Sequence, residues 1–99
     1  MSPAFRIEAV SWPSDGDGVM EIDRLSFPSP WTREMYEEEL RQPETAFVLV
    51  LRTAAAPVAG YCSCRLVADE LQINNVAVRP ECRRLGAGRA LVEAALERG

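Results

Sequence analysis

Residues 75–91 combine the residue types that bind an anion at the start of a helix. Arg83 and Arg84 precede Gly86 and Gly88, and a helical pattern follows directly. Glycine has no Cβ, so the backbone can approach a ligand closely and adopt dihedrals that other residues avoid. The free N–H groups and the positive dipole of a helix start favour negative charge, and guanidinium groups donate paired hydrogen bonds to phosphate oxygens. The segment therefore indicates a phosphate-binding site, although glycine pairs before helices are commonly simple turns.

Several other chemistries do not fit the residue types present. The glycine segment lacks the Gly-Lys-Ser/Thr ending of a P-loop and the third glycine of a dinucleotide-binding fingerprint. The chain has no histidine and three cysteines, Cys62, Cys64 and Cys82. We therefore expect no metal site, no disulfide framework and no Ser-His or Cys-His nucleophile within these residues.

Composition predicts one small cytoplasmic domain. The 99 residues are 47% apolar, which supports a single core. No stretch approaches the roughly 18 apolar residues that a membrane span needs, and the N-terminus has no signal-peptide pattern. Residues 1–50 hold four Arg against ten Asp and Glu, whereas residues 51–99 hold seven against five. This asymmetry favours a cationic partner for the first half and an anionic one for the second, and we expect no direct nucleic-acid or membrane contact.

The first half of the chain predicts one strand and two helices. Residues 5–9 alternate apolar and polar side chains, as a half-buried strand does, and residues 13–18 have turn chemistry. Asp17 can cap a helix that ends before residues 27–30. A second helix is expected from Thr32 to Pro43. The predicted inward-facing side chains of the two helices are Val19, Ile22, Leu25, Met35, Tyr36 and Leu40.

The second half predicts three consecutive strands and a final helix. The strands are expected over residues 46–51, 58–67 and 71–78, and the helix over residues 87–98. The inner face of this helix is predicted to hold Leu91, Val92, Ala95 and Leu96. The order indicates an α+β or mixed α/β fold, in which helices flank a mostly antiparallel sheet.

Three segments resemble the GNAT superfamily of N-acetyltransferases. Arg83-Arg84-Leu85-Gly86-Ala87-Gly88 matches its acetyl-CoA motif, Gln/Arg-x-x-Gly-x-Gly/Ala, and lies between a predicted strand and a predicted helix. Phe27-Pro28-Ser29-Pro30-Trp31-Thr32 before a helix, and Asn75-Val76-Ala77-Val78 before the arginines, are similar to ribosomal-protein-alanine N-acetyltransferases. The resemblance covers nearly all 99 residues in order.

The resemblance implies a set of acetyl-CoA contacts. The backbone of Val76, Ala77 and Val78 would pair with the pantetheine arm, although these residues also read as an ordinary buried strand. The pyrophosphate would lie on the segment Arg83, Arg84, Leu85, Gly86, Ala87, Gly88 and Arg89. A bulge near Asn75 or Val76 would direct an N–H group at the thioester oxygen.

The resemblance also implies the acceptor. Phe27, Trp31 and Asn75 are candidate substrate-binding residues, with the acidic residues 37–39 beside them, although Trp31 also reads as a core residue. The implied reaction is direct attack on acetyl-CoA by the α-amino group of a protein N-terminus, such as the N-terminal Ala of a basic ribosomal protein. An α-amine has a pKa of about 7.7 to 8.0, so roughly a tenth of it is neutral at pH 7.

In the resembled family the fold continues with a strand, a helix and two strands, which carry the catalytic base and acid. Residues 1–99 are therefore expected to form a single, C-terminally incomplete domain, with these catalytic groups beyond Gly99. The alternatives are a non-catalytic CoA-binding fragment that needs a partner, and an acetyltransferase for another amine. The chain alone is expected to be marginally folded or self-associated.

Overall fold

The computed structural model describes residues 5–98, apart from the side chains of Arg84 and Leu85. Its sheet has four antiparallel strands in the order β1-β2-β3-β4. The strands are β1 (Phe5–Ala9), β2 (Ala46–Thr53), β3 (Gly60–Val67) and β4 (Glu70–Val78). The helices are α1 (Gly16–Ser26), α2 (Arg33–Leu40), the 3-10 helix η1 (Pro80–Leu85) and α3 (Ala87–Arg98). The predicted α+β fold and element order are confirmed.

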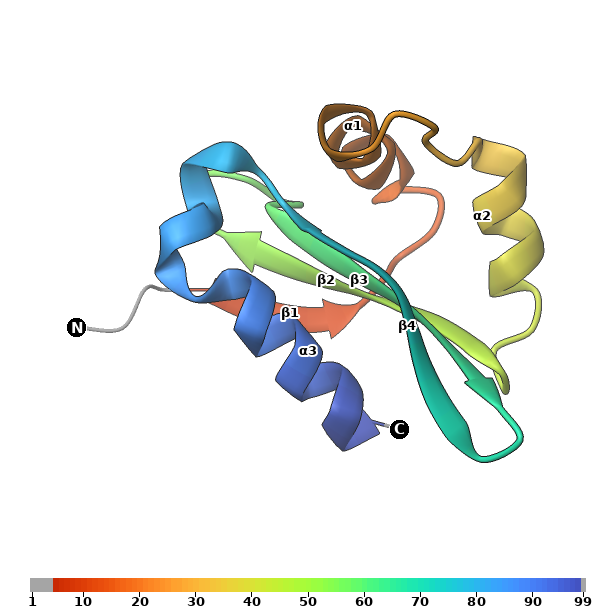
Figure 1. Ribbon diagram of the computed structural model, residues 1–99. Coiled ribbons are helices and arrows are strands. Elements are labelled where there is room, and N and C mark those ends of the chain that lie inside the picture. The colour runs from red at the N-terminus through yellow and green to blue at the C-terminus, as the bar shows by residue number, and fades with distance from the viewer. Residues whose placement is uncertain (1–4, 99) are drawn as a thin grey trace.

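Helices cover both faces of the sheet (Figure 1), with α1 and α2 on one face and α3 on the other. Strand β2 is buried over residues 46–51, as its continuous apolar run predicted. Its alternating side chains supply both cores: Phe47, Leu49 and Leu51 face α3, whereas Val48 and Val50 face α1 and α2. The central strand therefore holds the two layers together.

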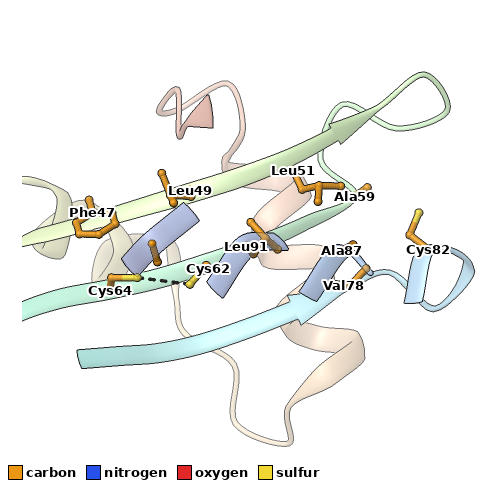
Figure 2. Close-up of a cluster of buried hydrophobic side chains, with 11 residues drawn as sticks. Phe47, Leu49, Leu51, Ala59, Cys62, Cys64, Val78, Cys82, Ala87 and Leu91 are labelled. Atoms are coloured by element: carbon orange, nitrogen blue, oxygen red, sulfur yellow. Dashed lines mark hydrogen bonds between the residues drawn. The ribbon is translucent and has the colours of Figure 1, made fainter. Parts of the chain in front are cut away.

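The core under α3 is built from small and branched side chains. Leu91 and Ala95 are fully buried against β2 and β3, and the view in Figure 2 shows Leu91 among Leu49, Cys62 and Leu51. The predicted place of Leu96 on this inner face is wrong, because its side chain is 60% exposed. The buried face of α3 is narrow because only one row of its side chains packs against the sheet.

Two further predicted core residues lie at the surface. Leu25 is 59% exposed, since a three-residue spacing drifts by about 60° per step around a helix and carries it off the face of Val19 and Ile22. Met35 is 45% exposed, and its sulfur instead accepts a hydrogen bond from the Thr32 N–H at 3.5 Å. This contact belongs to a capping box at the start of α2.

The start of α1 is fixed by Asp15, not by the predicted cap Asp17. The buried Asp15 carboxylate accepts the Ser11 N–H at 2.7 Å and two Arg52 N–H groups at 2.8 and 3.0 Å. Arg52 also donates to Glu8 at 2.7 Å. The hydrogen bond from Arg52 lowers the pKa of Asp15, although burial opposes the shift. This group of side chains joins β1 and β2 to the helix that borders the candidate site.

Within residues 5–98, no helix is long and apolar enough to cross a membrane. Across the same residues, no group of three or more Cys, Asp or Glu side chains is arranged to hold a metal ion. Cys62, Cys64 and Cys82 are buried free thiols, and the Sγ atoms of Cys62 and Cys64 are 3.4 Å apart.

The two leucines of α3 give a matched test of this packing. Leu91→Ala is expected to lower the free energy of unfolding by about 2–5 kcal/mol, because it leaves a cavity between α3 and the sheet. Leu96→Ala is expected to change it by less than about 0.5 kcal/mol, because the side chain is largely in water. Chemical denaturation followed by circular dichroism measures both, and equal losses would contradict the orientation of α3.

Candidate functional site

A β-bulge in β4 determines which side chains reach the candidate site. Ser63 of β3 pairs with Asn75, but the next residue, Cys64, pairs with Ile73, so Asn74 is an extra residue in β4. Beyond the bulge, Asn75 and Ala77 lie on the side of α1 and α2, whereas the Val76 side chain packs toward α3. The resemblance described above implied a bulge near Asn75 or Val76, and the structure has one directly before Asn75.

The strand edge beyond the bulge carries backbone groups that face away from β3. The Arg79 N–H donates to the Ala59 carbonyl at 2.8 Å, so the backbone groups of Arg79 face the sheet. Because this orientation alternates along an antiparallel strand, Ala77 also faces β3, whereas Val76 and Val78 face the open edge. Arg83 Nε donates to the outward Val78 carbonyl at 3.1 Å. Two of the three residues predicted to pair with an extended ligand thus present their polar groups to the open edge of the sheet.

The predicted glycine loop is partly helical. Pro80 to Leu85 form η1, which ends at Gly86 with φ 74°, a left-handed conformation that favours glycine. Helix α3 follows directly, and Ala90 N–H donates to the Gly86 carbonyl at 3.0 Å. A side chain at Gly88 would meet no heavy atom within 4 Å. The strand, the arginines, the glycines and the helix therefore form a compact corner, and the first N–H groups of α3 have no partner within the helix.

The arginines and the remaining motif residues differ in their surroundings. Arg83 is exposed, and within the described side chains it pairs with no carboxylate. Arg89 forms an ion pair with Glu93 at 2.8 Å. Ala87 is buried in the core under α3. The predicted cofactor contacts of the Arg84 and Leu85 side chains lie outside the described residues.

A groove with a volume of about 330 Å³ lies between α1 and the β4-η1-α3 corner. It brings together five of the predicted cofactor-binding residues and one predicted acceptor residue. Its lining residues are Ser26, Phe27, Val76, Ala77, Val78, Arg83 and Gly88. One end is apolar and the other carries a guanidinium group. The sequence did not single out Ser26, which the end of α1 places opposite β4.

A smaller pocket of about 180 Å³ adjoins the groove. It contains all three predicted acceptor residues, and Phe27 lines both cavities. Its lining residues are Asp23, Phe27, Pro28, Ser29, Pro30, Trp31 and Asn75. We call the first cavity the groove and the second the small pocket. Both cavities are lined by residues of β4 beyond the bulge: Val76, Ala77 and Val78 in the groove, and Asn75 in the small pocket.

One residue of the small pocket is a buried carboxylate that the sequence did not single out. Asp23 is fully buried, and its two oxygens accept hydrogen bonds from the hydroxyls of Tyr36 and Tyr61. Burial raises the pKa of Asp23, and the hydrogen bonds from Tyr36 and from the Trp31 backbone lower it in part. Asp23 thereby joins α1, α2, β3 and the loop of Trp31. Its place four residues after Val19, on the apolar face of α1, is the sequence signal that could have identified it.

The acidic run of α2 is occupied by contacts within the protein. Trp12 Nε1 donates to Glu37 at 3.2 Å, and Arg41 donates to Glu38 at 2.7 Å. Glu39 pairs with Arg65. These carboxylates, which the sequence suggested as an acceptor-side face, attach α2 to the loop before α1 and to β3.

Comparison with known proteins identifies the family. Residues 16–99 match the model of the acetyltransferase (GNAT) family, and the chain belongs to this family. It is 40% identical over 83 residues to a Bacillus subtilis (strain 168) protein assigned provisionally as a ribosomal protein bS18-alanine N-acetyltransferase. The match covers 84% of this chain and 54% of that relative, so the chain spans about half the length of the curated relative.

Solved structures have the same fold. The ribosomal-protein-S18-alanine N-acetyltransferase of Escherichia coli superimposes with a TM-score of 0.80 at 24% identity, over 96% of this chain and 59% of that one. Ard1 of Thermoplasma volcanium gives 0.82 at 29% identity, over 95% and 62%. The Escherichia coli GNAT protein YhbS, solved in complex with CoA, gives 0.74 at 25% identity, over 98% and 58%.

The raised pKa of Asp23 predicts how stability changes with pH. The folded protein holds a proton on Asp23 more tightly than the unfolded chain, whose ordinary pKa is 3.8. As pH falls from neutral through the raised pKa toward 3.8, the contribution of Asp23 to stability therefore rises. We expect wild-type protein to gain stability relative to Asp23→Asn over this range, measured by denaturation at a series of pH values.

Asp15 provides the control, because its pKa is shifted in the opposite direction to that of Asp23. Its pKa is lowered, so its contribution is present above its ordinary value of 3.8 and is lost only as pH falls below that value. The stability difference between wild type and Asp15→Asn should thus stay constant in the range where the Asp23→Asn difference changes. If the stability difference from wild type were independent of pH for both variants, the result would contradict a raised pKa of the buried Asp23.

Proposed function

We propose that this chain binds acetyl-CoA in the groove and forms the cofactor-binding and acceptor-facing part of an N-acetyltransferase. The observation that carries the proposal is the pair of cavities that share Phe27 and are both lined by β4 beyond the bulge. The groove ends at Arg83 and Gly88, and the small pocket begins at the bulge beside Asn75. The acetyl group would therefore lie near Phe27, where the cavities meet.

The groove has the chemistry of an extended amide chain attached to a phosphate. The outward backbone groups of Val76 and Val78 can pair with the amides of the pantetheine arm as an added strand would. The exposed Arg83 guanidinium and the N–H groups at the start of α3 suit the pyrophosphate. YhbS, a structural neighbour, is a GNAT protein in complex with CoA.

The acceptor we propose is the α-amino group of a protein N-terminus, with Ala as its first residue. The small pocket is lined by Phe27, proline residues and Trp31, and about 180 Å³ accommodates a short side chain. The relatives from Bacillus subtilis and Escherichia coli are named as enzymes that acetylate an alanine of a ribosomal protein. We propose a basic acceptor protein, which agrees with the acidic balance of residues 1–50.

In the proposed reaction the neutral amine nitrogen attacks the thioester carbon. The carbonyl electron pair moves to oxygen, and the bulge in β4 would supply an N–H group to that oxyanion. The C–S bond then breaks, the amide forms, the amine loses a proton and the CoA thiolate gains one. An α-amine needs little help to become neutral near pH 7. We assign the general base and acid to none of the described residues.

Gly88 gives the sharpest test of the groove. Gly88→Val is expected to weaken acetyl-CoA binding about tenfold or more, because the new side chain occupies the ligand's place. Thermal stability should not fall, since a side chain there meets no atom within 4 Å and glycine is a poor helix residue. Isothermal titration calorimetry with acetyl-CoA measures the affinity. Glu97→Val, an exposed change at the far end of α3, serves as the control.

Unchanged acetyl-CoA affinity in Gly88→Val, with binding intact in wild type, would contradict the location of the cofactor site. Weak binding in both variants would instead indicate that any added valine disturbs α3.

Acceptor preference is tested with peptides that differ in one group. In a full-length version of the protein, we expect acetylation of a basic peptide with a free N-terminal Ala and none of the same peptide with a blocked α-amine and an internal lysine. Mass spectrometry distinguishes the products. Acetylation of the lysine alone would assign the protein to another amine substrate, and acetyl-CoA binding without transfer to either peptide would favour a non-catalytic CoA-binding role.

A further inference from the structure

One buried hydroxyl in the wall of the groove has no hydrogen-bond partner. Among the described residues, Ser26 Oγ is the buried side-chain polar atom that finds neither a donor nor an acceptor in the protein. Ser26 lines the groove together with Phe27 and the outer residues of β4. Buried polar groups are nearly always paired in folded proteins, so an unpaired one in a cavity wall points to a partner that enters the cavity.

The position of Ser26 is held firmly by its neighbours. It is the last residue of α1, and the following Phe27 N–H donates to the Asp23 carbonyl at 2.9 Å. Three residues earlier, the Asp23 side chain is bound by two tyrosines. On the same helix, Glu21 forms an ion pair with Arg79 at the end of β4. The end of α1 is thus fixed against the strand edge, and Ser26 is held in the wall of the groove.

The hydroxyl is also not used to terminate the helix. A serine in a helix commonly donates to the carbonyl of the preceding turn, and Ser26 makes no such contact. Since a serine hydroxyl both donates and accepts, it suits an amide group, which offers a carbonyl and an N–H. At the end of the groove near Ser26, the lining residues are Phe27 and Val76. The cationic side chain of the groove, Arg83, belongs instead to η1. An uncharged amide fits these surroundings.

We propose that the Ser26 hydroxyl binds an amide of the pantetheine arm, across the groove from the backbone groups of Val76 and Val78. The inference rests on the proposed function, because it requires CoA in the groove. The arm would then be held from two sides: by β4 through the backbone and by α1 through one side chain. This contact would make the end of α1 part of the cofactor site as well as a border of the small pocket.

Ser26→Ala tests the proposal because it predicts opposite effects on stability and binding. The free protein should become more stable, with its unfolding midpoint raised by about 2–8 °C, because an unpaired buried hydroxyl is removed. The dissociation constant for CoA should rise about 3- to 10-fold, because one hydrogen bond is lost. A structural serine would show the reverse pattern, with stability lost. Ser14→Ala, an exposed serine near the start of α1, is the control for both measurements.

A second ligand separates the arm from the phosphates. Adenosine 3′,5′-bisphosphate lacks the pantetheine arm, so its affinity should be the same for wild type and Ser26→Ala. Calorimetry with both ligands and differential scanning fluorimetry of the free proteins complete the experiment. Equal CoA affinities in the two proteins, or an equal loss for both ligands, would overturn the role of Ser26. If wild-type protein bound neither ligand, the proposed function itself would fail.

Discussion

The site depends on one extra residue in one strand. If β4 kept a regular alternation through Asn74, Asn75 and Ala77 would face α3 as Ile73 does, and Val76 and Val78 would lie under α1. Because of the bulge, Asn75 and Ala77 instead lie on the side of the two cavities. Before the bulge, Leu71 and Ile73 pack toward α3, and after it the same face is continued by the valines. The bulge is therefore the constraint on which the groove and the small pocket both depend.

Charged and polar side chains hold the neighbouring elements around that strand. Asp23 with its two tyrosines fixes α1 against β3, and Arg79 joins the end of β4 to Glu21 and to the Val58 carbonyl. At the other end of α1, the ion pair between Asp15 and Arg52 joins the helix to β2. Burying ionic groups adds little to stability compared with apolar packing, but it fixes geometry because each partner has few alternatives. These contacts set the width of the groove between α1 and β4.

The sequence was sufficient for the fold and for the position of the motif, because both depend on local patterns. Strand alternation, helix periodicity and the arginine and glycine spacing are visible within about ten residues. The place of Asp23 on the apolar face of α1 is a local signal of burial, but its tyrosine partners lie far along the chain. Ser26 has no local signal, since its importance arises from a distant strand edge. Leu25 was misplaced for a related reason, because a small error in helical phase grows with each turn.

The central claim is that the outward backbone groups of β4 bind the cofactor. Residue-resolved hydrogen–deuterium exchange, with and without CoA, tests it most directly. Saturating CoA should slow exchange of the Val76 and Val78 amides strongly, because they face the open edge. The Ala77 amide, which faces β3, should change much less. A uniform change across residues 76–78, or protection of β1 (Phe5–Ala9) instead, would contradict the account.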